Sequence, residues 1–138
     1  MSLQISEITK SEIPEVVALW QKCELTRPWN DPGRDIDFAM SSDNATILVG
    51  KIENEIVAGV MTGHDGHRGA IYYLAVDPAH QSKGLGREIH NAAVAWLKSI
   101  GVWKINLLVR NQNEKVHGFY QKLGYSTNEV LSFGKVLD

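Results

Sequence analysis

The segment from Ile71 to Ile89, IYYLAVDPAHQSKGLGREI, constrains the fold of the chain more than any other part. An apolar run, Ile71–Val76, is followed by a short connection with two glycines and by a helical pattern that begins at Leu85. The first N–H groups of a helix have no intrahelical acceptor, and the helix dipole favours negative charge beside them. Lys83 and Arg87 add positive charge there. The segment therefore predicts a strand, an anion-binding turn and a helix.

The residues that follow extend this segment into a strand–helix–strand unit. An apolar stripe at helical spacing runs from Leu85 to Ile100, and Gly101 ends it. Trp103–Val109 is almost continuously apolar, which is typical of a strand buried on both faces and parallel to its neighbour. We therefore expect a right-handed βαβ crossover over Ile71–Val109.

The first third of the chain has the pattern of one strand and two helices. Alternating apolar residues predict a strand within Leu3–Ile8. Thr9 and Glu12 have the spacing of a capping box, and apolar residues at helical spacing then predict a helix that ends near Leu25. After a loop rich in proline, Asp35–Met40 is predicted to be a second helix.

Two runs rich in β-branched residues precede the central segment. Thr46–Ile52 and Ile56–Thr62 are joined by Glu53-Asn54-Glu55, which indicates a hairpin with a turn of three to four residues. Together with Ile71–Val76 they predict an antiparallel meander. Gly59, inside the second run, suggests a bulge or a close backbone approach.

The end of the chain is expected to hold one more helix and one more strand. Asn111 and Glu114 can cap a helix that Gly124 ends. Ser126–Leu137 is expected to contain a final strand that returns antiparallel beside the strand at Trp103–Val109.

Composition excludes several classes of partner. A chain of 138 residues fits one domain, residues 1–138, and its net charge of −2 without any Lys/Arg-rich run gives no reason to expect nucleic acid. No apolar segment approaches the ~20 residues of a membrane span, and the N-terminus lacks a signal-peptide pattern, so we expect a cytoplasmic protein. Cys23 is the single cysteine, and His64 and His67 lack a third ligand, so no metal is expected.

The Gly-rich turn differs from two familiar phosphate loops. It has no G-x-x-x-x-G-K-[ST], and a dinucleotide fingerprint would need a small residue where Ile89 stands. Its sequence is Gln81-Ser82-Lys83-Gly84-Leu85-Gly86, and Asn113 and the run Phe119-Tyr120-Gln121-Lys122-Leu123-Gly124-Tyr125 follow downstream. This pair of motifs resembles the GNAT N-acetyltransferase family. CELTRPWNDP and DGHRGAIYYLAV further resemble a small, YpeA-like bacterial subgroup of it.

The resemblance implies an α/β (α+β) fold and acetyl-CoA as cosubstrate. The GNAT fold has a mixed, mostly antiparallel sheet of six or seven strands with a splayed parallel pair, flanked by about four helices. Backbone groups of Leu74, Ala75 and Val76 would then pair with the pantetheine arm like an added strand. The pyrophosphate would be held by residues of the turn and the helix start: Gln81, Lys83, Gly84, Leu85, Gly86 and Arg87.

Tyr120 is the residue that the resemblance assigns to chemistry. A phenol placed at the CoA sulfur can protonate the thiolate that leaves during acyl transfer. The helical spacing of Tyr120 with Val116 and Leu123 would equally suit a core tyrosine. Asn113 resembles the family's contact to the CoA arm, although Asn111 or Asn113 could simply cap the helix.

Acceptor recognition is expected from the loop after the first predicted helix and from the turn between the predicted strands Ile56–Thr62 and Ile71–Val76. Trp29, Asn30, Asp31, Asp65 and His67 are the candidates for the acceptor site. Asp65, His67, Tyr72 and Tyr73 are candidates for a base or for ordering water. Trp29 could instead cap the core from its loop, and both aspartates could simply stabilise turns.

Three functions remain open from the sequence. The first is acetyl transfer to the amine of a small molecule, and the second is acetylation of a protein N-terminus or lysine. The third is a CoA-binding module without catalysis. A homodimer is possible, and neither a nucleic acid nor a membrane is expected as a partner.

Overall fold

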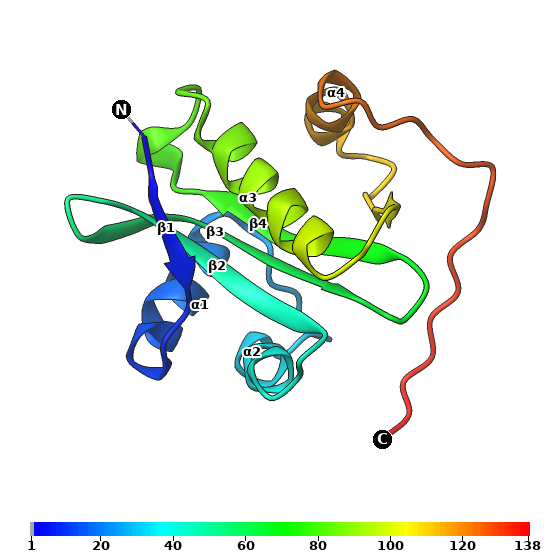
Figure 1. The fold of residues 1–138 in the computed structure, drawn as a ribbon, viewed down its shortest axis with the longest axis horizontal. Helices are drawn as coiled ribbons and strands as arrows, with labels where there is room; N and C mark the ends of the chain where they lie inside the picture. Colours follow the sequence, from blue (N-terminus) through cyan, green and yellow to red (C-terminus); the bar gives the residue numbers. More distant parts are fainter. Residues whose placement is uncertain (1) are drawn as a thin grey trace. The chain divides into compact units, whose positions relative to one another are not determined.

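The computed structural model describes residues 2–138, which divide into two compact units (Figure 1). The first unit ends at Asn106, and the second is Leu107–Asp138. Each unit is described by itself below.

The first unit contains a mixed sheet of five strands in the order β1-β2-β3-β4-β5. Neighbouring strands are antiparallel, except that β4 and β5 are parallel. The antiparallel meander and the parallel pair are therefore confirmed. The strands are β1 (Gln4–Glu7), β2 (Ala45–Ile52), β3 (Glu55–His64), β4 (Gly69–Val76) and β5 (Ile105–Asn106).

Three α-helices cover this sheet, and a fourth belongs to the second unit. α1 (Ile13–Lys22) and α2 (Pro32–Met40) lie on one face of the sheet, and α3 (Leu85–Ser99) lies across the other (Figure 1). α4 (Glu114–Lys122) is the helix of the second unit. Two short 3-10 turns, η1 (Lys10–Glu12) and η2 (Pro78–His80), precede α1 and α3. The prediction of about four helices is confirmed.

The core between α1, α2 and the sheet follows the two periodicities read from the sequence. Ile47 and Val49, two residues apart in β2, face it together with Ala75 of β4. Trp20 of α1 and Ile36 of α2 are fully buried against them. On the other face, α3 buries a stripe at helical spacing that consists of Leu85, Ile89, Ala93 and Leu97.

The helix starts and the hairpin turn follow from local chemistry. Glu12 accepts the Thr9 N–H at 2.9 Å in the predicted capping box. The hairpin turn is shorter than predicted, with two residues, Glu53 and Asn54, whose φ angles are 50° and 67°. Two consecutive left-handed residues match the twist of the flanking strands, as in a type I′ turn.

β4 contains a bulge opposite Val60, next to the residue Gly59 at which the sequence suggested an irregularity. Gly59 pairs with Ala75 and Met61 pairs with Tyr72, so a single residue of β3 faces two residues of β4. Tyr73, inside the bulge, has φ of 53°. A left-handed conformation costs a residue with a Cβ about 1–3 kcal/mol, so neighbouring contacts must stabilise it.

The two strands predicted after α3 are a correction. β5 covers Ile105–Asn106 instead of Trp103–Val109, and it pairs with β4 only at Gly69 and Ala70. Ser126–Leu137 contains no strand, so the sheet has five strands and not six or seven. A strand is stabilised by pairing with another backbone as well as by apolar character. Apart from the pairing of Ile105 and Asn106 with β4, no partner strand runs beside these residues in the described part of the chain.

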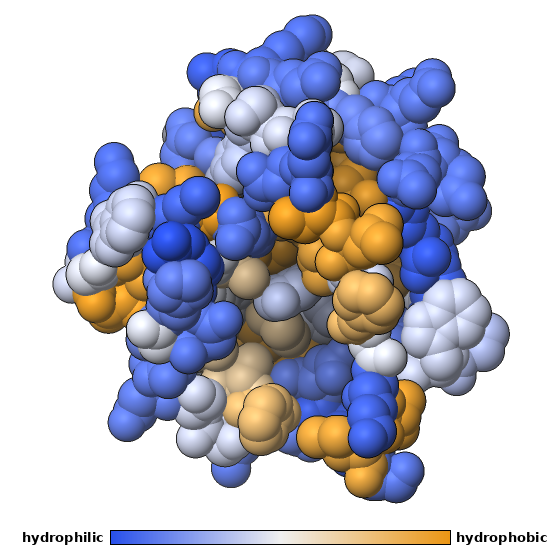
Figure 2. All heavy atoms as spheres, turned by 90° about the vertical axis from the view of Figure 1, so that its right-hand side faces the viewer, coloured by the Kyte–Doolittle hydropathy of each residue, from blue (hydrophilic) through white to orange (hydrophobic). Residues whose placement is uncertain are grey.

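Apolar side chains reach the surface in several places among polar ones (Figure 2). In the first unit, Trp103 is 79% exposed, and the Arg68 guanidinium lies 4.7 Å from the centre of its ring. The apolar run that suggested a doubly buried strand therefore begins with an exposed side chain.

Gly63 tests the packing at the end of the hairpin. A Cβ at Gly63 would lie 2.8 Å from the carbonyl oxygen of Asn44, which is rigid backbone. We expect Gly63→Ala to lower the free energy of unfolding by about 1–3 kcal/mol. Gly33→Ala is the matched control, because its Cβ would make only ordinary contact at 3.6 Å within α2. Urea unfolding of both variants measures this, and equal stability would contradict the packing described.

Candidate functional site

Asp77 anchors the point at which β4 ends and the Gly-rich connection begins. Its N–H donates to Val57 O at 2.8 Å, and its Oδ1 accepts the Ala79 N–H at 2.9 Å, which caps η2. Its Oδ2 lies 3.0 Å from Lys22 Nζ of α1. The Ala79 N–H, and then Lys22, hold the pKa of this carboxyl below its usual value. The connection therefore starts from a fixed position on the sheet.

The Gly-rich turn has the backbone shape of an anion-binding loop. Ser82 and Gly84 are both left-handed, with φ of 65° and 79°, and Gly84 is the N-cap of α3 without a side-chain cap. The first intrahelical bond runs from Glu88 N–H to Gly84 O, so the preceding N–H groups have no helical acceptor. Lys83 and Arg87 are exposed beside them. These features suit a bound pyrophosphate.

The edge of β4 that pairs with β5 has no backbone partner after Ala70 among the described residues. The other edge is paired with β3, where the Asp77 N–H bond to Val57 marks a hydrogen-bonded position. Because backbone groups of a strand alternate between its edges, those of Ala75 face β3 and those of Val76 and Leu74 face the open edge. Of the three residues predicted to bind pantetheine, Leu74 and Val76 therefore have backbone groups at this edge, and Ala75 does not.

The side chain of Gln81 makes a hydrogen bond to the end of β4 that the sequence did not predict. Its side-chain Nε2 donates to Val76 O at 3.0 Å, and the Cys23 thiol donates to the same oxygen at 3.3 Å. Cys23 packs against the core, and burial raises the pKa of its thiol. A protonated, partly buried thiol is a poor nucleophile.

In the second unit, contacts at the end of α4 hold Tyr120 in position. Gly124, with φ of 96°, donates its N–H to Gln121 O at 3.1 Å, and the Tyr125 N–H donates to Tyr120 O at 3.1 Å. These two bonds form a Schellman motif. Such a motif usually includes an apolar contact between the two residues of the second bond, which here are Tyr120 and Tyr125. Accordingly, the Tyr125 ring meets the Tyr120 ring edge to face, with centroids 5.5 Å apart.

The Tyr120 phenol is kept in its protonated form. Burial, and to a lesser degree Tyr125, raises its pKa to about 12. Phe119 packs edge to face against it at 5.1 Å. Asn113 occupies the N-cap position of α4, but its side chain makes no capping hydrogen bond, and Asn111 is outside that position. The geometry therefore allows Tyr120 to act as an acid and gives Asn113 no side-chain capping role.

The acceptor candidates are distributed over two loops and one strand. Trp29 is 69% exposed, so the prediction that it caps the core is wrong. Asp31 Oδ1 accepts the Arg34 N–H at 3.0 Å as the N-cap of α2. Asp65 Oδ1 accepts the N–H groups of His67 and Arg68, both at 2.8 Å, and these bonds lower its pKa.

The turn-stabilising alternative is thus confirmed for both aspartates. Asn30 and His67 are exposed, and His67 belongs to the turn between β3 and β4. Tyr72 is exposed on β4, whereas its neighbour Tyr73 is half-buried.

Asp35 is a residue that the sequence did not single out. Its Oδ2 accepts the Tyr73 hydroxyl at 2.8 Å, and the Tyr73 ring stacks on Trp20 with centroids 4.0 Å apart. Burial, followed by Asp35, raises the pKa of Tyr73 well above its usual value. A phenol held in its neutral form cannot serve as the base. Because the contact joins residues far apart in the sequence, no local pattern could have revealed it.

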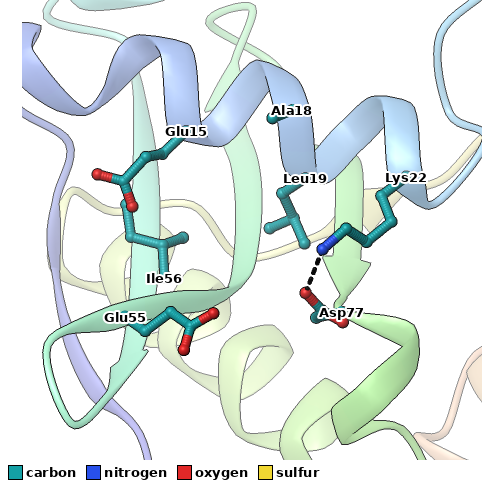
Figure 3. Close-up of a pocket in the computed structure, with 7 residues that line it drawn as sticks. All are labelled: Glu15, Ala18, Leu19, Lys22, Glu55, Ile56 and Asp77. Carbon is teal, nitrogen blue, oxygen red and sulfur yellow. Dashed lines mark hydrogen bonds and ion pairs between the residues drawn. The ribbon is translucent and has the colours of Figure 1, made fainter.

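A depression of about 130 Å³ lies between α1 and the ends of β3 and β4 (Figure 3). It is lined by Glu15, Ala18, Leu19, Lys22, Glu55, Ile56 and Asp77. Its size is well below the ~300–1,000 Å³ of ordinary ligand pockets. The Lys22–Asp77 ion pair spans one end of the depression and joins α1 to the end of β4.

Residues 2–138 contain no cluster of three His, Cys, Asp or Glu side chains that could hold a metal ion. Over the same range, every helix is too short or too polar to cross a bilayer.

Comparison with solved structures identifies proteins of the same fold. One is an aminoglycoside acetyltransferase from an uncultured soil metagenomic sample in complex with sisomicin, with a TM-score of 0.81 and 18% identity over 99% of this chain and 97% of that one. Another is a predicted acetyltransferase with acetyl-CoA from Clostridium acetobutylicum, with a TM-score of 0.78 and 17% identity over 96% of both chains.

A third is glucosamine-6-phosphate N-acetyltransferase from Arabidopsis thaliana, with a TM-score of 0.75 and 22% identity over all of both chains. At these identities the likeness shows the fold alone. The sequence model of the acetyltransferase (GNAT) family matches residues 13–125, which include the Gly-rich turn, Asn113 and Tyr120. The chain therefore belongs to the GNAT acetyltransferase family.

Proposed function

We propose that the protein is an N-acetyltransferase that moves an acetyl group from acetyl-CoA to a primary amine of a small molecule. The observation that carries the proposal is the Gly-rich turn with left-handed Ser82 and Gly84, which opens α3 directly after the unpaired edge of β4. The family match extends through both units, which supports a single acetyltransferase domain over residues 1–138.

The cosubstrate binds through backbone groups and two cations. The open edge of β4 offers the Val76 N–H and backbone groups of Leu74 to the amide groups of the pantetheine arm, in the manner of an added strand. The Val76 carbonyl oxygen is already held by Gln81 and Cys23. The N–H groups at the start of α3 and the charges of Lys83 and Arg87 bind the pyrophosphate. Gln81 contributes by holding the carbonyl of Val76, and Asn113 is proposed as a further contact to the CoA arm.

The reaction is a direct acyl transfer. The lone pair of a neutral amine attacks the thioester carbonyl carbon, a C–N bond forms, and the C–S bond breaks. Tyr120 donates its phenolic proton to the departing thiolate, and the nitrogen loses one proton to solvent. Solvent then returns a proton to Tyr120, so the products are the acetylated amine and CoA thiol. A backbone N–H of β4 polarises the carbonyl oxygen.

The acceptor itself must arrive neutral or lose its proton to water. A primary α-amine with a pKa near ~8 needs little help at neutral pH. The hydrogen bonds from His67 and Arg68 that lower the pKa of Asp65 make this carboxylate a weak base. We therefore propose a site without a dedicated strong base, in which Asp65, His67 and Tyr72 at most order water.

Small-molecule amines are favoured over protein acceptors. Two proteins of the same fold are, by their names, an aminoglycoside acetyltransferase and a glucosamine-6-phosphate N-acetyltransferase. Acetylation of a protein terminus or lysine is the second candidate, because Trp29 and Asn30 are exposed and could contact a larger partner. Membership of the YpeA-like subgroup, a cytoplasmic location and a homodimer stay predictions from the sequence.

An amine panel tests the proposed activity. The protein is incubated with acetyl-CoA and with amino sugars, polyamines, amino acids or peptides, and free CoA thiol is measured. We expect release above background with at least one small amine. Release with peptides alone would favour a protein acceptor, and no release together with tight acetyl-CoA binding would indicate a module without catalysis.

Tyr120→Phe tests the acid. The substitution removes the proton donor and retains the ring that packs against Phe119 and Tyr125. Loss of general acid catalysis should lower kcat about 10²-fold or more, with little change in acetyl-CoA affinity. Unchanged turnover would remove Tyr120 from the mechanism.

Gly124→Ala tests whether the helix end positions Tyr120. Alanine at a φ of 96° should cost about 1–2 kcal/mol of stability and disturb the Tyr120–Tyr125 contact. Gly101→Ala is a matched control, because Gly101 follows α3 with a φ of 93° and open space around its Cα. Both variants should lose similar stability, but only Gly124→Ala should lose kcat as well. Equal kcat in the two variants would show that the motif serves stability alone.

A further inference from the structure

The bulge in β4 is fixed from both helices on one face of the sheet. The ring of Tyr73 stacks on Trp20 of α1, with centroids 4.0 Å apart and an interplanar angle of 7°. Its hydroxyl donates to Asp35 Oδ2 of α2 at 2.8 Å. All three residues belong to the first unit, so the arrangement is independent of the second.

The two anchors of Tyr73 are themselves rigid. Trp20 is fully buried in the core. Asp35 lies in the first turn of α2, where Asp31 caps the helix by accepting the Arg34 N–H. A left-handed aromatic residue persists only where its surroundings fix it. The ring stack and the hydroxyl bond provide that constraint.

The bulge decides which backbone groups of β4 reach the open edge. Between the Met61–Tyr72 and Gly59–Ala75 pairs, β4 has one residue more than β3. One extra residue in a strand reverses the edge that each of the following backbone N–H and C=O groups faces. The orientation of the Leu74 and Val76 N–H groups therefore depends on the bulge at Tyr73.

We propose that Asp35 is a positioning residue for acetyl transfer. By accepting the Tyr73 hydroxyl, it fixes the β4 bulge and with it the N–H groups that face the open edge. The inference rests on the proposed function, since one of those N–H groups polarises the thioester carbonyl. Asp35 itself touches neither the acetyl group nor the amine in this role.

Three variants of α2 test the role in turnover. Asp35→Ala removes the acceptor, Asp35→Asn keeps an oxygen that can accept the same hydroxyl, and Asp37→Ala is an exposed control on the same helix. We expect Asp35→Ala to lower kcat about tenfold or more, because a displaced oxyanion donor loses part of its ~10²–10³-fold effect. The KM for acetyl-CoA should stay within about twofold in the steady-state assay.

Rescue separates positioning from charge recognition. Asp35→Asn should keep kcat within about threefold of the wild type, and Asp37→Ala should match it. An equal loss in Asp35→Asn and Asp35→Ala would overturn the proposal, because the carboxylate charge and not the hydrogen bond would then matter. Unchanged kcat in Asp35→Ala would overturn it as well.

Amide NMR spectra give a readout that needs no substrate. In Asp35→Ala, the N–H resonances of Leu74, Ala75 and Val76 should shift, whereas in Asp37→Ala they should coincide with those of the wild type. Unmoved resonances would overturn the proposed link from Asp35 to the bulge. If Asp35→Ala does not fold, Tyr73→Phe removes the same hydrogen bond and is judged by the same criteria. A wild type that acetylates no amine contradicts the proposed function, and these resonances still decide the role of Asp35.

Discussion

The pairing of β4 is the constraint on which the candidate site depends. One edge of β4 is paired with β3 from Gly69 to Val76 on both sides of the bulge, and the other is paired with β5 only at Gly69 and Ala70. Asp77 then fixes the end of the strand by bonds to β3, η2 and α1. An edge left open inside an otherwise paired sheet, followed at once by a helix N-terminus, offers hydrogen-bond donors to an extended, anionic ligand.

Local patterns predicted the elements around this strand well, since their determinants are close in the sequence. The Thr9–Glu12 capping box and the start of α3 at Leu85 both depend on a few adjacent residues. The long β5 and the final strand were wrong because apolar character does not supply a partner strand. The Tyr73–Asp35 bond was missed because its two residues meet only in the folded chain.

The same distinction holds within the candidate site. The sequence predicted the residues of the Gly-rich turn, but the hydrogen bond from Gln81 to Val76 O and the turn-stabilising bonds of Asp31 and Asp65 required coordinates. Asp31 and Asp65 are engaged by backbone N–H groups, so acceptor recognition cannot be assigned from charge alone. The sequence around Tyr120, in contrast, is explained by the Schellman motif at the end of α4. In this motif Gly124 adopts the left-handed conformation that ends the helix, and Tyr125 packs against the Tyr120 ring.

The account centres on acetyl-CoA binding at β4 and the start of α3, and titration calorimetry measures this most directly. We predict saturable binding of one acetyl-CoA per chain, weakened by Lys83→Ala and Arg87→Ala and by added salt, because both cations are proposed to contact the pyrophosphate. Exposed Lys98 on the last turn of α3 gives the control, and Lys98→Ala should bind like the wild type. Absence of saturable heat, or equal affinity in all four proteins, would contradict the assignment of the Gly-rich turn.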